Sequence, residues 1–295
     1  MKKITTLLFA TILLCGVAYA LDGLTVGAEY RVRDFDADEV SEVMDVRLNV
    51  AYEGAFMEEA LEIEAEVGFG MQNFDDMRNG LDVELQARYY FDVSAISTMS
   101  FILNSKTSIP FDDEKGYHGI AGFSNKPISW LKPGVHHGHE LSFGKINIQI
   151  DVPLLLVHDT MDAFDIVGID FILSLNERKG RGLYQRGNVS GFANGFGAEF
   201  KMESIITDPS DSDFAQRLEI TPFFGHNLLY AEVEVGLPLY EDGFDLEGMT
   251  IKPKFEMDIP PVNGLSMYLD VPISNIGADV GDPVFGVGLG VNFNF

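Results

Sequence analysis

Apolar and polar residues alternate with a period of two along most of the chain. From Leu24 to Val32 every second residue is apolar or aromatic, whereas the residues between them include Glu29 and Arg31. Successive side chains of a β-strand point to opposite faces, so this alternation predicts strands with one apolar and one polar face. The same pattern returns in the ranges 44–53, 61–70, 81–91, 146–152, 167–175, 196–202, 218–224, 229–237, 251–259, 265–273 and 285–295.

The length of these strands distinguishes two all-β architectures. Soluble sheets commonly use strands of about five or six residues, whereas a tilted strand that crosses a bilayer needs about 9–11. A closed barrel also leaves no unpaired sheet edge, which hydrocarbon does not tolerate. We therefore predict that residues 21–295 form one domain, a transmembrane antiparallel up-and-down β-barrel. A soluble β-sandwich or solenoid is the alternative that periodicity alone leaves open.

The C-terminal sequence favours the membrane barrel. Residues 285–295, FGVGLGVNFNF, alternate to the final position. This segment resembles the C-terminal strand of bacterial outer-membrane proteins, in which a terminal aromatic residue serves as the recognition signal of the barrel-assembly machinery. The resemblance implies that Phe293 and Phe295 form such a signal and that the assembly machinery is a partner of this chain.

The lengths of the connecting segments predict the number of strands. Outer-membrane barrels have short periplasmic turns and longer outer loops, with both chain ends in the periplasm. Loops counted from the two ends agree with an even total only if another strand lies between Pro110 and Glu140, and His118–Ser124 is the candidate. This gives fourteen strands. Twelve is the alternative, with the proline-rich region 118–162 folded inward as a loop.

The first twenty residues have the features of a secretory signal peptide. Lys2 and Lys3 precede a short apolar stretch that ends in Ala18-Tyr19-Ala20, so we expect cleavage after Ala20 and location in the outer membrane. Removing this segment removes the only cysteine and changes the formal charge from −26 to −28. The mature chain then has no disulfide, and no basic surface for nucleic acid. No later segment has about 18 consecutive apolar residues, so helical membrane spans are not expected.

The polar face of the predicted strands carries rows of charged residues. Neither lipid nor a dry core could hold them, so they must face water, either outside a soluble sheet or inside a barrel lumen. By alternation the lumen receives sixteen acidic and eight basic residues, an excess that would concentrate cations. The residues predicted to line the pore are Glu29, Arg31, Asp45, Arg47, Glu62, Glu64, Glu66, Asp82, Glu84, Arg88, Arg217, Glu219, Glu232, Glu234, Lys252, Lys254, Glu256 and Asp258.

Two functions follow from this lumen. A water-filled interior makes the protein a narrow, cation-preferring porin for small hydrophilic solutes. Alternatively, the charges pair into ladders that brace a filled barrel, since twelve to fourteen strands enclose a space between that of filled and of open barrels. The protein is then a non-conducting, surface-exposed structural or antigenic barrel. The partners in the first case are outer-membrane lipid and small cations or polar solutes, and the oligomeric state stays open.

Other chemistry is less well supported. His136, His137 and His139 could coordinate a transition metal, but a flexible loop beside Gly134 and Gly138 is the favoured interpretation. The acidic run 208–213, DPSDSD, is expected to be a solvated loop rather than a calcium site. The His-x-Ser pair of outer-membrane phospholipases and lipid A deacylases is absent, because Gly122 precedes Ser124 at that spacing. We expect no enzyme activity, no cofactor and no metal.

The whole mature chain has a general family resemblance. Its acidic, Phe/Gly/Asp-rich composition and terminal phenylalanine resemble bacterial porin-like proteins, and its length and few basic residues resemble spirochaetal surface proteins of the variable surface protein type. The resemblance implies an outer-membrane barrel. It depends on composition and the final strand, so no functional residue is transferred from it.

Overall fold

The structure is a computed structural model of the whole chain. It describes residues 23–34, 43–57, 60–74, 77–94, 96–142, 144–157, 165–166, 168–176, 195–205, 216–226, 228–240, 243–244, 249–260, 264–274, 276 and 283–294. The predicted signal peptide, the acidic run 208–213 and Phe295 lie outside these residues. Within the described ranges, no helix has the length and apolar character needed to cross a membrane.

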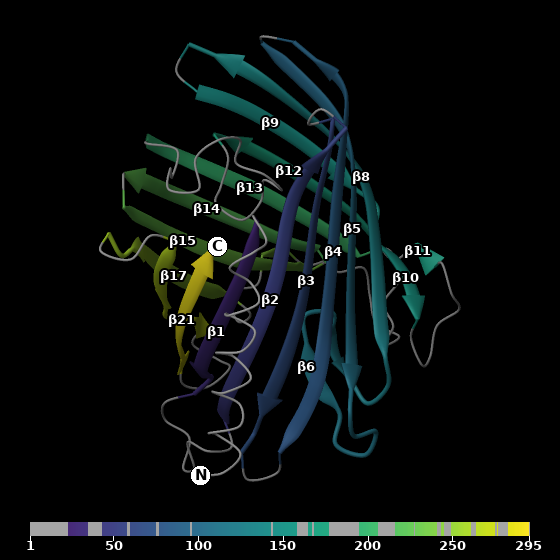
Figure 1. Cartoon of the computed structure of the whole chain (residues 1–295), viewed down its shortest axis with the longest axis vertical. Coiled ribbons are helices and arrows are strands. Elements are labelled where there is room, and N and C mark those ends of the chain that lie inside the picture. Colours follow the sequence, from purple (N-terminus) through teal and green to yellow (C-terminus); the bar gives the residue numbers. More distant parts are fainter. Residues whose placement is uncertain are drawn as a thin grey trace.

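The described chain is a closed antiparallel β-barrel of fourteen strands (Figure 1). The first strand pairs with both the second and the last, which closes the ring. The wall strands are β1 (Leu24–Val32), β2 (Met44–Phe56), β3 (Leu61–Gln72), β4 (Arg78–Val93), β5 (Ser97–Pro110), β8 (Ile128–Leu141), β9 (Gly144–Asp151), β12 (Gly168–Leu175), β13 (Gly195–Ile205), β14 (Gln216–His226), β15 (Leu229–Tyr240), β17 (Thr250–Asp258), β18 (Leu265–Asp270) and β21 (Val287–Asn294).

Short strands extend the wall or lie beside it. The strand β10 (Leu154–Val157) follows β9 and pairs with the same neighbour, β8. The strands β19 (Ile273–Ser274) and β20 (Val284–Phe285) pair with each other next to β18 and β21. Two further two-residue strands, β11 (Asp165–Ile166) and β16 (Gly243–Phe244), pair with β10 and β15. The prediction of fourteen strands is therefore confirmed, and the alternative of twelve is wrong.

The alternation of residue types sets which face of the wall each side chain occupies. Large apolar residues at the alternate positions are exposed on the outer face, as Phe101, Val135 and Phe255 illustrate at 54%, 46% and 55% of their surface. The intervening charged residues face inward. A shift of one residue in register would exchange the two faces, so the hydrophobic pattern fixes the pairing of the long strands. The all-β barrel predicted from period two is confirmed.

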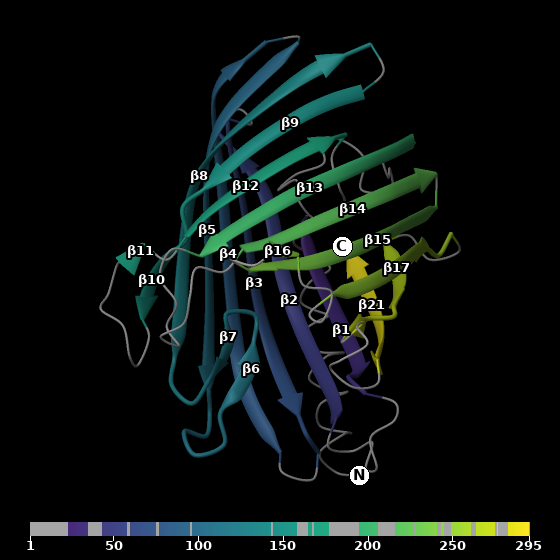
Figure 2. The same cartoon turned by 180° about the vertical axis from the view of Figure 1, so that it is seen from behind.

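The strand expected at His118–Ser124 is not part of the wall. The wall strand between Pro110 and Glu140 is β8, whereas β6 (Tyr117–Gly119) and β7 (Gly122–Ser124) form a separate two-stranded sheet. This hairpin, residues 117–124, lies against the inner side of β3, β4 and β5 (Figure 2), and we call it the lumen hairpin. The strand β8 was not predicted because its outward positions include Pro133, His137 and His139, which interrupt the apolar alternation.

The histidine cluster lies in a regular strand. His136, His137 and His139 are paired with β5 on one side and β9 on the other. The expected flexible loop at these positions is therefore wrong. The sequence suggested a loop because Gly134 and Gly138 are residues typical of loops. In the structure both glycines lie on the inner face of β8, where a Cβ would crowd the side chains of Asp151 and Lys145.

Candidate functional site: the barrel lumen

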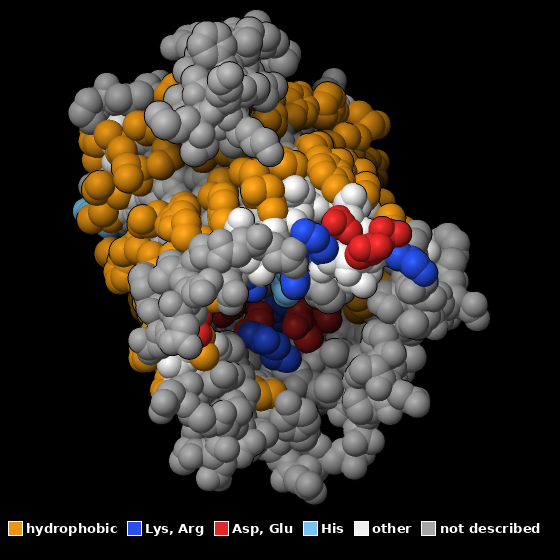
Figure 3. Space-filling view, turned by 90° about the horizontal axis from the view of Figure 1, so that it is seen from below, with side chains coloured by type: hydrophobic (Ala, Val, Ile, Leu, Met, Phe, Trp, Pro, Cys, Tyr) orange, Lys and Arg blue, Asp and Glu red, His pale blue; other side chains and the backbone are white. Residues whose placement is uncertain are grey.

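Charged side chains line the interior of the barrel. Figure 3 looks into the end of the barrel that carries the lumen hairpin, and it shows acidic and basic side chains inside a hollow next to an apolar outer surface. The charged residues come from strands all around the ring, because every wall strand presents its second face to the interior. The lumen is thus the part of the molecule where polar chemistry is concentrated.

Strand register places most of these charges opposite a charge of the other sign. Glu29 faces Arg47, and Arg31 faces Asp45, between β1 and β2. Cross-strand pairs of opposite sign stabilise a sheet, by roughly 0.2–1 kcal/mol each. The same arrangement occurs at Glu62/Arg88, Glu84/Lys106, Lys201/Glu219, Glu203/Arg217, Glu232/Lys254, Glu234/Lys252 and Lys254/Asp270.

Side-chain contacts connect many of these charges into ladders. On β13 and β14, Lys201 pairs with Glu203 and lies 3.4 Å from Glu219, whose other oxygen is 3.1 Å from Arg217. On another part of the ring, Lys132 of β8 reaches across β9 to Asp170 of β12 at 2.9 Å. These ladders brace the wall and leave little net charge where they lie.

The wall formed by β2, β3 and β4 departs from this rule. Glu53 lies directly opposite Glu64, and Glu66 lies directly opposite Glu84. Arg47 lies 2.9 Å from Glu66, and Lys106 lies 3.4 Å from Glu84. Within the described residues, no side-chain hydrogen bond or ion pair at 4.0 Å or less reaches the carboxylates of Glu53 and Glu64. Asp170 of β12 likewise lies opposite two acids, Asp151 and Glu203, but Lys132 pairs with Asp170 and Lys201 pairs with Glu203. The pair Glu53 and Glu64 differs in having no cationic partner among the described residues.

The inner side chains differ in exposure along the barrel. Glu62 and Thr221 expose 1% of their surface, and the inward aromatic residues Phe223 and Tyr230 pack together at 5% and 4%. By contrast, Arg33 and Arg217 are nearly half exposed and lie at the ends of β1 and β14 toward the lumen hairpin. Side chains thus fill part of the interior.

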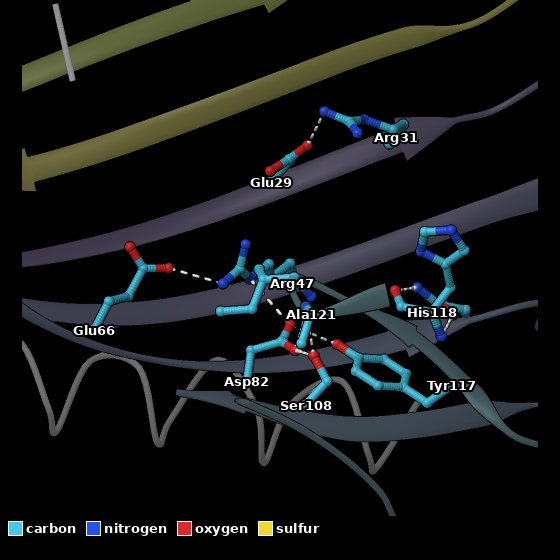
Figure 4. A network of polar contacts seen from close by, with 11 residues as sticks. Glu29, Arg31, Arg47, Glu66, Asp82, Ser108, Tyr117, His118 and Ala121 are labelled. Carbon is cyan, nitrogen blue, oxygen red and sulfur yellow. Dashed lines mark hydrogen bonds and ion pairs between the residues drawn. The ribbon is translucent and has the colours of Figure 1, made fainter. Parts of the chain in front are cut away.

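A hydrogen-bond network fixes the lumen hairpin to the wall (Figure 4). The Asp82 carboxylate on β4 accepts hydrogen bonds from the Tyr117 hydroxyl at 2.8 Å, the Ser108 hydroxyl at 2.7 Å and the Ile120 backbone N–H at 3.1 Å. Ser108 in turn accepts a hydrogen bond from the Ala121 N–H at 2.9 Å. Burial, followed by the charge of Asp82, raises the pKa of the Tyr117 phenol, so its hydroxyl remains a donor at neutral pH.

The residues predicted to line the pore lie on the described wall strands, on the face opposite the apolar belt. They are not equally accessible: Asp82 and Asp270 are 2% and 1% exposed, because the lumen hairpin or neighbouring side chains cover them. Sequence reasoning missed Lys106, Lys132 and Asp170. Asp170 stands between Ile169 and Phe171 and could have been found by alternation, whereas the strands of the two lysines have weak apolar patterns.

The histidines do not converge on one point. His136 faces inward, where its Nδ1 lies 3.5 Å from the buried Ser100 hydroxyl. His137 and His139 occupy outward positions, with their rings stacked at 6.3 Å. Among the described residues there is no group of three or more His, Cys, Asp or Glu side chains arranged to hold a metal ion.

The final strand places Phe293 on the outer face. It is paired with Val26 of β1 and Leu265 of β18, and shares its face with the exposed Leu289 and Val291. Its partner in the predicted assembly signal, Phe295, lies outside the described residues. The final strand is therefore an integral part of the ring closure.

No protein-family model and no curated protein sequence matches this chain. Among solved structures, the barrel is similar to the outer membrane protein Omp33 of Acinetobacter baumannii, with 9% identity over 93% of this chain and 98% of that protein and a TM-score of 0.49. It is also similar to CdiB of Acinetobacter baumannii, with 9% identity and a TM-score of 0.50; the match covers 93% of this chain and 60% of CdiB.

A third similar structure is the KdgM porin, with 7% identity over 92% of this chain and 99% of that protein and a TM-score of 0.41. The structural neighbours are thus bacterial outer-membrane porins and channels. At these identities the likeness concerns the fold alone. The predicted outer-membrane β-barrel fold is confirmed at that level, whereas the assembly signal in the final strand and the spirochaetal resemblance stay predictions.

Proposed function

We propose that this chain is an outer-membrane barrel that forms a narrow, cation-preferring pore for small hydrophilic solutes and has no enzyme activity. The observation that carries the proposal is the pair Glu53 and Glu64, two inward carboxylates that face each other without an ion-pair partner among the described residues.

The outer surface supports location in a membrane. Large apolar side chains with 37–63% of their surface exposed occur on strands all around the ring, and water does not tolerate a continuous apolar belt of this extent. Burying one such side chain in hydrocarbon stabilises the inserted state by about 1.5–3 kcal/mol. Since only helices and closed barrels satisfy their backbone groups inside lipid, the ring closure of β1 on β21 fits a spanning wall.

The selectivity follows from the arrangement of the inner charges. Ladders such as Lys201/Glu219/Arg217 hold both signs within 3.4 Å, so an ion in the lumen experiences little net field from them. Glu53 and Glu64 place two facing carboxyl groups at the end of the barrel where β1 begins. In a narrow lumen their potential is less screened than on an open surface, which attracts cations and repels anions.

A non-conducting surface barrel is the second candidate. The observation that favours it is the near-complete burial of inner groups such as Glu62, Thr221 and Phe223, together with the lumen hairpin. If these groups close the interior, the outer loops carry the function. Conductance separates the two candidates directly.

Targeting belongs to the same proposal. We infer that residues 1–20 are a signal peptide cleaved after Ala20, and that the barrel-assembly machinery binds the final strand through Phe293 and Phe295. The support is the sequence pattern at both ends of the chain and the position of Phe293 on the outer face of the strand that closes the ring.

The test is reconstitution of the refolded chain from Leu21 onward in a planar bilayer with a salt gradient. We expect discrete conductance steps and a reversal potential on the cation side. Replacing Glu53 and Glu64 by glutamine keeps their shape and removes the negative charge that the pair carries, so the reversal potential should move toward the anion side. Low salt gives the larger shift, because the Debye length is about 30 Å at 0.01 M and about 10 Å at 0.1 M.

The matched control is the double variant Lys201→Gln/Glu219→Gln. It also replaces two charged lumen side chains by glutamine, but removes one charge of each sign, so the reversal potential should stay close to that of the wild type. Equal shifts in both double variants would show that the Glu53/Glu64 pair does not determine selectivity. A folded protein without conductance would favour the surface barrel.

A further inference from the structure

The lumen hairpin is bound to the wall through a built docking site. Besides the bonds to Asp82, the side chain of Gln72 on β3 pairs with the backbone of His118 in both directions: its amide donates to the His118 carbonyl at 2.7 Å, and its carbonyl accepts from the His118 N–H at 3.0 Å. The Trp130 indole N–H on β8 donates to the Ala121 carbonyl at 2.9 Å. Four wall strands, β3, β4, β5 and β8, thus hold the lumen hairpin.

The wall beneath the hairpin has space for one aromatic ring. Gly70 of β3 and Gly80 of β4 lie directly opposite each other, and Tyr117 packs against both of them. A Cβ at Gly80 would overlap the ring of Tyr117, and a Cβ at Gly70 would overlap its hydroxyl oxygen. Tyr117 is accordingly 2% exposed. Any larger residue at either position is incompatible with the docked hairpin.

Apolar contacts complete the attachment. Ala121 packs with Ile128 and Leu155, with Trp130 against the same cluster, and Leu155 is fully buried. The hairpin therefore replaces water on both a polar and an apolar part of the inner wall. Since the buried Asp82 accepts two hydrogen bonds from the hairpin, withdrawing the hairpin would leave polar groups on both sides to be rehydrated.

We propose that the lumen hairpin is a fixed constriction that limits the size of permeating solutes, and that Asp82 anchors the constriction instead of attracting ions. The docked hairpin covers the inner side of β3, β4 and β5 toward one end of the barrel, so solutes pass along the remaining wall. Asp82 was predicted from the sequence to line the pore. In this proposal it affects permeation indirectly, because it holds the lumen hairpin in place. This inference rests on the proposed channel function for its conductance measurement.

The test uses Gly80→Val, which adds bulk under Tyr117 and alters no charge. Valine suits a strand, so the barrel should still fold, as the β-type circular dichroism spectrum will show. The expected result is a larger single-channel conductance and entry of larger polyethylene glycols, with the reversal potential unchanged. Tyr117→Ala, which leaves the wall intact and removes the docked ring, should give the same result if Gly80→Val fails to fold.

Release of the hairpin is measured independently of conductance. The chain from Leu21 onward has no cysteine, so Ala121→Cys supplies a single thiol at a position that is 9% exposed in the docked hairpin. Maleimide should modify this thiol at least about tenfold faster in the Gly80→Val background, because a buried group reacts only from the released state. Gly138→Val is the control, since it adds the same bulk on the inner face of β8, against Lys145 and Thr98, and should not speed labelling.

The outcomes separate this inference from the proposed function. If the wild type conducts and the variants with a released hairpin, Gly80→Val and Tyr117→Ala, have the same conductance, the hairpin is not a constriction, but the proposed pore is still supported. If labelling is as fast in the wild type as in Gly80→Val, the docked hairpin is overturned. If neither wild type nor released variants conduct, the proposed pore itself fails and the constriction falls with it. A closed wild type with conducting released variants would support the constriction in its strongest form.

Discussion

Arg31 links strands across the closure of the ring. Its guanidinium Nη2 lies 2.7 Å from Glu29 Oε1 on its own strand and 3.3 Å from Asp270 Oδ2 on β18, two strands away beyond β21. Asp270 is 1% exposed, and its next cation, Lys252, is more distant at 3.8 Å. Arg33, just after the end of β1, pairs with Asp45 at 3.1 Å, but nearly half of its side chain is exposed. The two arginines thus offer a comparison of buried and exposed ion pairs.

We expect Arg31→Met to destabilise the barrel by about 1–3 kcal/mol, because it leaves the buried Asp270 carboxylate without its nearest cation. Arg33→Met is the matched control and should cost at most about 1 kcal/mol, as is usual for exposed pairs. Urea unfolding in lipid vesicles, followed by the fluorescence of the only tryptophan, Trp130, measures both. An equal decrease in the free energy of unfolding in the two variants would show that the Arg31–Asp270 contact does not stabilise the closure of the ring.

The long strands could be predicted because a single physical constraint fixes each of them. In β2, β3 and β4 the apolar residues alternate without interruption, so one register satisfies both lipid and water. Loop parity then required one more wall strand between Pro110 and Glu140, and the total of fourteen is confirmed. The position of that strand was wrong, because β8 places Pro133, His137 and His139 on its outer face.

The lumen hairpin and the charge pairing could not be obtained from alternation. Whether Asp82 meets water or Tyr117 depends on a contact between segments 35 residues apart, which periodicity does not encode. Similarly, Glu64 and Glu66 look equivalent in the sequence, but the register places Glu53 opposite the first, and the Arg47 side chain lies 2.9 Å from the second. The sequence therefore predicts which residues lie on the inner face, but not which of them form ion pairs, anchor the hairpin or stay without a partner.

The final strand provides a prediction at the same scale. We expect deletion of Phe295 to reduce the amount of protein in the outer membrane far more than it reduces stability, since one terminal side chain contributes at most about 3 kcal/mol of apolar burial but ends the proposed assembly signal. The measurement compares surface abundance in cells with refolding yield in detergent. Leu289→Ala, an apolar truncation within the same strand, is the control; similar abundance for wild type and the Phe295 deletion would argue against an assembly role.

At the scale of the whole molecule, the two ends of the barrel differ. The first and last wall strands begin and finish at the same end, as the pairing of Thr25 with Asn294 shows. Tight connections such as Leu141 to Gly144 and His226 to Leu229 occur at that end. The segment between β12 and β13 is a long exception there. The other end carries longer connections, including those that flank the lumen hairpin, which fits an outward-facing side.

This asymmetry predicts the orientation in the membrane. A chain delivered from the inner side and folded into an even number of strands keeps both termini in the periplasm, so the segment between β1 and β2 should face the medium, and the turn between β8 and β9 should not. We expect an epitope inserted within residues 35–42 to bind antibody on intact cells. The same epitope inserted between Leu141 and Gly144 should bind only after permeabilisation, and a total-protein blot of both insertions controls for expression. The reverse pattern would place the termini outside and, with them, Glu53 and Glu64 at the outer mouth of the pore.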